Sequence, residues 1–149
     1  MEAHGVHGGG DGPGTVPAGV DGSPTSFRAA AYGAGLARRQ GAWLVAAFVA
    51  RTPATARLVP DAETSLQSTL AEIGEEVRWE LEEGARGAGV RVEFVSLSGD
   101  PFRELSRLAE ELQADAVVVG TSTHTGHRLV GSLAVRLVRA GRWPVTVVP

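Results

Sequence analysis

DAVVVGTSTHTGHRLVGS, residues 115–132, contains a short apolar run, a polar loop and a Gly–Ser pair, in that order. The apolar run is typical of a strand that is buried on both faces, as in a parallel sheet covered by helices. Gly131 and Ser132 stand directly before a segment with helical periodicity, which predicts a helix start there. The stretch therefore predicts a strand, a loop and a helix in succession, which is the repeating unit of a parallel α/β sheet.

The same alternation of strand and helix signals extends over the rest of the chain. Strands are expected at 15–20, 43–50, 90–97, 115–120 and 144–149, and helices at 24–40, 61–85, from 101 and at 131–140. Parallel strands need crossover connections, and right-handed helical crossovers give an open sheet with helices on both faces. We predict one α/β domain over residues 15–149, with an open, doubly wound, five-stranded parallel sheet of Rossmann-like type. Residues 1–14 are rich in Gly and His and are expected to form a disordered tail.

Three helix starts are marked by side chains that can cap a helix. Ser23 and Asp100 each precede a proline, the combination favoured at the first helical position, and Asp61 is a further candidate cap. The long helix after Asp61 carries an apolar face at steps of three or four residues. That face comprises Leu66, Leu70, Ile73, Val77 and Leu81.

Composition excludes several classes of function. The chain has 14 basic residues, all of them Arg, against 17 acidic ones, for a net charge of -3. This balance argues against nucleic acid or an anionic membrane as a partner. Cys is absent, which excludes disulfides and thiolate chemistry, and no apolar run approaches membrane-spanning length. The first residues lack a basic region and an apolar core, so we expect a cytoplasmic protein.

Ligands of open α/β sheets bind beyond the carboxyl ends of the strands, which directs attention to the loops there. Gly131 and Ser132 offer free backbone N–H groups at a helix start, which either bind an anion or belong to an ordinary helix cap. Asp21 follows the first strand and either accepts hydrogen bonds from a nucleoside or stabilises the turn at Gly22. His124 and His127 are interpreted as solvent-exposed rather than as metal ligands. Ser132 has no base near it in sequence, so we do not expect it to act as a catalytic nucleophile. We expect no catalytic residue and no metal site in this chain.

Three segments resemble the universal stress protein family. They are VDGSPTSFRAA from Val20, GDPFRELSRLAEELQADAVVVG from Gly99 and DAVVVGTSTHTGHRLVGSLAVRLVRAGRWPVTVVP from Asp115. The resemblance implies strand order 3-2-1-4-5, a homodimer joined through the last strand, and a regulatory or protective role in the stress response. It covers nearly all of the chain after the tail.

The resemblance also implies a site for ATP or another adenine nucleotide, with Mg²⁺ only if a triphosphate binds. The implied contact positions are Gly19, Asp21, Val49, Val119, Gly120, Thr123, Gly131, Ser132 and Leu133. Thr123 stands where ATP-binding members carry a second glycine, and the interval to Gly131 is shorter than their pattern by two residues. Two alternatives therefore stay open. One is a member that does not bind nucleotide and acts through protein contacts, and the other is a slow ATPase or nucleotidyl transferase.

Overall fold

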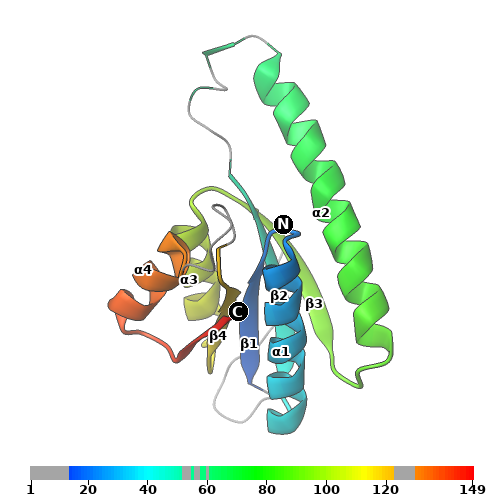
Figure 1. The fold of residues 1–149 in the computed structure, drawn as a ribbon, viewed down its shortest axis with the longest axis vertical. Coiled ribbons are helices and arrows are strands. Elements are labelled where there is room, and N and C mark those ends of the chain that lie inside the picture. Colours follow the sequence, from blue (N-terminus) through cyan, green and yellow to red (C-terminus); the bar gives the residue numbers. More distant parts are fainter. Residues whose placement is uncertain (1–13, 52–54, 56–57, 60, 123–129) are drawn as a thin grey trace.

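The computed structural model describes residues 14–51, 55, 58–59, 61–122 and 130–149 (Figure 1). Strands and helices alternate along the chain in nine elements. They are β1 (Thr15–Val20), α1 (Pro24–Gln40), β2 (Trp43–Ala50), α2 (Ala62–Arg86), β3 (Val92–Ser98), α3 (Pro101–Glu111), β4 (Val117–Gly120), α4 (Ser132–Ala140) and β5 (Val145–Val148). The tail predicted over residues 1–14 lies, except for Gly14, outside the described residues.

The five strands form one parallel sheet in the order β3-β2-β1-β4-β5, as predicted. The chain builds outward from β1 to β3 on one side and then returns to place β4 and β5 on the other. The order therefore reverses between β1 and β4, which are direct neighbours. In sheets of this type, that reversal opens a crevice at the carboxyl ends of the two strands.

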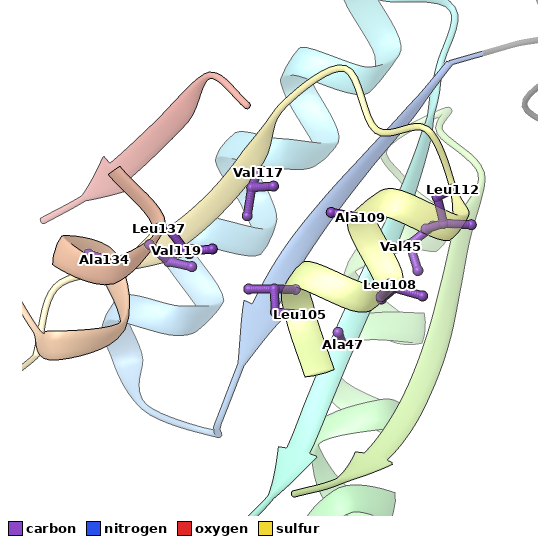
Figure 2. Packing of buried hydrophobic residues seen from close by; sticks show 10 residues of the cluster. All are labelled: Val45, Ala47, Leu105, Leu108, Ala109, Leu112, Val117, Val119, Ala134 and Leu137. Atoms are coloured by element: carbon purple, nitrogen blue, oxygen red, sulfur yellow. The ribbon is translucent and has the colours of Figure 1, made fainter. Parts of the chain in front are cut away.

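Helices cover both faces of the sheet. Helices α3 and α4 pack on one face, around the cluster shown in Figure 2: Val45, Ala47, Leu105, Leu108, Ala109, Leu112, Val117, Val119, Ala134 and Leu137. Helices α1 and α2 cover the opposite face, where two further clusters of buried residues lie. Alternate residues of β2 pack into the clusters on the two faces of the sheet, because successive side chains of a strand point to opposite faces. The apolar run 43–50 is thus explained by burial on both faces.

Two of the three predicted caps are confirmed. The Ser23 hydroxyl accepts a hydrogen bond from the Ser26 amide at 3.2 Å, and an Asp100 carboxylate oxygen accepts one from the Arg103 amide at 3.0 Å. The prediction for Asp61 is wrong. Asp61 precedes α2 with a φ of 67° and makes no capping hydrogen bond through its side chain. Its left-handed backbone differs from the extended conformation that directs a capping side chain at the first helical amides.

The predicted apolar face of α2 is buried only in part. Val77 and Leu81 are buried, Leu66 and Leu70 are half-buried, and Ile73 is 37% exposed. Helix length explains the difference, since the 25 residues of α2 span about 37 Å, whereas the eight residues of β2 span about 26 Å. The first half of α2 accordingly extends beyond the ends of the strands (Figure 1).

No helix within the described residues is both long enough and apolar enough to cross a bilayer.

Candidate functional site at the strand-order reversal

A cleft of about 270 Å³ lies at the carboxyl ends of β1, β2 and β4 and at the start of α4. Eight of the nine predicted contact positions line this one cleft. They are Gly19, Asp21, Val49, Val119, Gly120, Gly131, Ser132 and Leu133. The ninth, Thr123, lies outside the described residues, as do His124 and His127. The structure therefore brings together positions that are more than 110 residues apart in the chain.

Asp21 forms one end of the cleft, directly after β1. One of its carboxylate oxygens, Oδ1, accepts a hydrogen bond from the Ser23 amide at 2.9 Å, which closes the turn before α1. Desolvation raises the pKa of Asp21, but hydrogen bonds from Ser23 and Ser26 outweigh it and hold the pKa below its ordinary value. Asp21 is therefore a carboxylate at neutral pH. A carboxylate has about four acceptor sites, so Asp21 can close the turn through Oδ1 and still accept a hydrogen bond from a ligand. The two interpretations of Asp21 are therefore compatible.

Gly120 has a structural role that the sequence did not indicate. A Cβ atom at this position would lie 2.7 Å from the backbone carbon and oxygen of Thr25 and 3.0 Å from the Ser26 nitrogen. The Thr25 hydroxyl donates a hydrogen bond to the Thr121 carbonyl at 2.8 Å and so fixes the first turn of α1 against the end of β4. Gly120 is thus required for contact between two backbone segments of this chain, whether or not a ligand approaches it.

The N-terminus of α4 forms the other end of the cleft. Gly131 occupies the cap position and offers no side-chain acceptor, in contrast to the capped starts of α1 and α3. The first amides of a helix have no partner within the helix, and the helix dipole favours negative charge near them. Gly131 has an extended backbone with φ −68°, which any residue can adopt, and a Cβ there would meet the Ser122 Cβ at 3.0 Å. Close packing against Ser122 therefore accounts for the glycine.

Hydroxyl groups line much of the remaining wall. Thr25, Ser26, Thr121 and Ser122 contribute to it, and none of these four is among the nine contact positions that the resemblance implies. The Thr121 hydroxyl oxygen is buried and has no hydrogen-bond partner among the described residues. The one available signal was the density of Ser and Thr in the two loops, which is equally typical of surface turns.

The described part of the cleft can form hydrogen bonds with polar groups of a ligand. Asp21 is the one ionisable side chain among the described lining residues. No cluster of three or more potential metal-ligating side chains occurs among the residues that the structure describes. The described lining thus combines the Asp21 carboxylate, several hydroxyls and the first amides of α4.

Comparisons with known proteins agree with this geometry. The model of the universal stress protein family matches residues 14–149. The chain is 32% identical to Universal stress protein MJ0531 of Methanocaldococcus jannaschii over 132 residues, which cover 87% of this chain and 78% of that protein. A crystal structure of a universal stress protein family member from Burkholderia pseudomallei superposes with a TM-score of 0.73 at 25% identity, covering 91% of this chain and 95% of the other. A universal stress protein crystallised in complex with cAMP gives a TM-score of 0.68 at 26% identity, with 91% and 97% covered.

Proposed function

Because the chain belongs to the universal stress protein family, we propose that it is a regulatory or protective module of the stress response that binds an adenine nucleotide in this cleft. The observation that carries the proposal is the convergence of eight predicted contact positions on one cleft. The cAMP complex of a structural relative supports the choice of ligand.

The two ends of the cleft suit the two ends of a nucleotide. We place the nucleoside at Asp21 and at the backbone of Val49, because the carboxylate can accept hydrogen bonds and main-chain groups can both accept and donate them. The phosphate is placed at the uncapped start of α4, beside Ser132. Each group of the ligand thus faces a partner of the matching chemistry.

A nucleotide with one phosphate fits the cleft better than ATP. The cleft measures about 270 Å³, below the usual range of about 300–1,000 Å³ for small-molecule sites. We therefore expect AMP or cyclic AMP to bind more tightly than ATP with Mg²⁺.

Titration calorimetry with AMP, cyclic AMP, ADP and ATP, with and without Mg²⁺, tests the proposal. Asp21→Asn is the informative variant, because Asn still closes the turn through its carbonyl oxygen but removes the charged acceptor. We expect it to weaken binding about tenfold, in line with the loss of a charged hydrogen bond. Asp61→Asn is the matched control, since Asp61 lies outside the cleft lining and should bind like the wild type. If folded protein gives no heat with any of the four nucleotides at millimolar concentration, nucleotide binding is refuted. The alternative of a family member that acts only through protein contacts is then favoured.

Catalysis is not part of the proposed role. Hydrolysis of a nucleotide needs an activated water and, as a rule, a metal. The described cleft residues include a single carboxylate, that of Asp21, and no cluster of metal-binding side chains occurs among the described residues. Phosphate release from ATP should therefore be no faster with the wild type than with an Asp21→Ala, Ser132→Ala double variant. A clear excess in the wild type would favour the slow ATPase.

We further propose that the protein is a homodimer joined through β5. This strand ends the sheet, and within the described residues it pairs only with β4, so its outer edge presents free backbone groups. Such an edge is a template for pairing with a second strand. Light scattering at micromolar concentration should give twice the mass of the chain, and the mass of a single chain would contradict the proposal.

A further inference from the structure

A second hollow lies between α1 and α2, on the face of the sheet opposite the nucleotide cleft. We call it the interhelical slot, and its volume is about 400 Å³. Its floor includes Leu44 of β2 and Val92 of β3, and its walls come from the facing sides of the two helices. The residues from α1 are Phe27, Ala30, Ala31, Ala34, Gly35 and Arg38, and those from α2 and the following turn include Glu80, Gly84, Ala85 and Ala88.

The slot exists because the side chains that border it are small. Packed helices normally interdigitate their side chains, and protein interiors leave few voids. Here Ala34 and Gly35 of α1 border the same hollow as Gly84 and Ala85 of α2, so little side-chain volume is available to fill it. A Cβ atom at Gly84 would have no neighbour within 4 Å. The result is a channel with an apolar lining that is open to solvent.

Charge is distributed unevenly along the slot. Arg38, in the last turn of α1, is exposed and donates a hydrogen bond to the Ala88 carbonyl at 3.4 Å, which places its guanidinium at the end where both helices finish. It forms no ion pair with any residue in the described parts of the chain. Glu80 borders the slot about two helical turns before that end. The Arg38 guanidinium offsets the negative C-terminal ends of the two helices and offers an anionic head group a partner there, whereas Glu80 repels an anion further along the slot.

We propose that the interhelical slot binds a free medium-chain fatty acid, with the carboxylate at Arg38 and the alkyl chain directed towards Phe27. The eleven positions from Phe27 to Arg38 correspond to about 16 Å of helix, which suits an extended alkyl chain of medium length rather than a short acid. Burial of the chain on the alanines and leucines supplies the binding free energy in proportion to the apolar area removed from water. The single guanidinium sets the orientation and selects a monoanion.

The inference does not depend on the nucleotide site. The slot and the cleft share no lining residue and lie on opposite faces of the sheet. Fatty-acid binding can fail while nucleotide binding persists, and the reverse is equally possible.

Calorimetry with sodium dodecanoate, below its micellar concentration, provides the test. Gly84→Leu should abolish binding, because the new side chain projects into the slot. The variant should also remain folded, since its Cβ meets nothing within 4 Å and leucine favours a helix more than glycine does. Ser68→Leu is the control for a leucine added to an exposed position of α2 away from the slot, and it should bind like the wild type.

The head group is tested separately. Arg38→Gln should weaken dodecanoate binding about fivefold and leave the binding of uncharged dodecanol unchanged, because only the carboxylate contact is lost. Butanoate should bind far more weakly than dodecanoate. The proposal is overturned if Gly84→Leu binds dodecanoate as the wild type does, if dodecylammonium binds as tightly as dodecanoate, or if the protein binds phosphatidylglycerol vesicles but not free dodecanoate.

Discussion

Substitution of Gly120 by alanine separates the structural role of this glycine from a role in ligand binding. The added methyl group would lie 2.7 Å from two backbone atoms of Thr25, whereas ordinary contact begins at about 3.4 Å. The end of β4 or the first turn of α1 must therefore move by roughly 0.7 Å, and backbone atoms cannot rotate away as a side chain can. Overpacking of this kind costs up to about 3 kcal/mol. The unfolded alanine variant has less conformational entropy than the unfolded glycine chain, which offsets up to about 1 kcal/mol of this cost. We therefore expect the free energy of unfolding to fall by about 2 kcal/mol.

Urea unfolding followed by circular dichroism measures this loss. With a denaturant dependence of about 2 kcal/mol per molar, the midpoint should fall by roughly 1 M at an unchanged slope. Gly131→Ala is the control, because its added methyl group would lie 3.0 Å from the Ser122 Cβ and no closer than 3.7 Å to backbone atoms, on a backbone that suits any residue. Its loss should stay below about 1 kcal/mol. If Gly120→Ala unfolds at the wild-type urea concentration but no longer binds nucleotide, the contact with Thr25 is not the reason for the glycine.

Three further expectations concern stability. Gly84→Ala should raise the free energy of unfolding by about 1 kcal/mol, because the position is helical and the added methyl group meets no neighbour within 4 Å; thermal unfolding checks this. Asp100→Ala should lower it by about 1–2 kcal/mol through loss of the α3 cap, whereas Asp100→Asn keeps a capping acceptor and should lose clearly less; equal losses in urea unfolding would argue against the cap. The pKa of Asp21 is lowered in the folded state, so its stabilising contribution is fully present above the unfolded value of about 3.9 and is lost as pH falls through the folded value. Melting temperatures measured from neutral to acid pH should therefore fall less steeply below about pH 4 in Asp21→Asn than in the wild type.

Local chemistry made most of the fold predictable. Ser23 and Asp100 mark helix starts because capping is an interaction within four residues, and the apolar run of β2 is decisive because burial on both faces leaves no polar position. Asp61 has the right residue type for a cap, but its backbone conformation depends on the preceding loop and cannot be deduced from composition.

The cleft was predictable in its positions but not in its packing. The loops at the carboxyl ends of the strands pointed to Asp21 and Gly131, the resemblance to a family added Val49, and the strand order brings the three together. The contact between Gly120 and Thr25 joins two elements that are distant in sequence, so no local pattern reveals it. The partial burial of α2 follows from its length relative to the strands, which is likewise a property of the assembled sheet.

The hydrogen bond from Thr25 to Thr121 spans 96 residues of sequence, and this separation determines when the cleft can form. Contacts between residues so far apart close a long loop, which is entropically costly and slow. A chain that has folded only β1, α1, β2, α2 and β3 already holds Asp21 and Val49, yet it lacks β4 and the start of α4. The cleft is therefore expected among the last features to be acquired during folding, after the sheet that supports it.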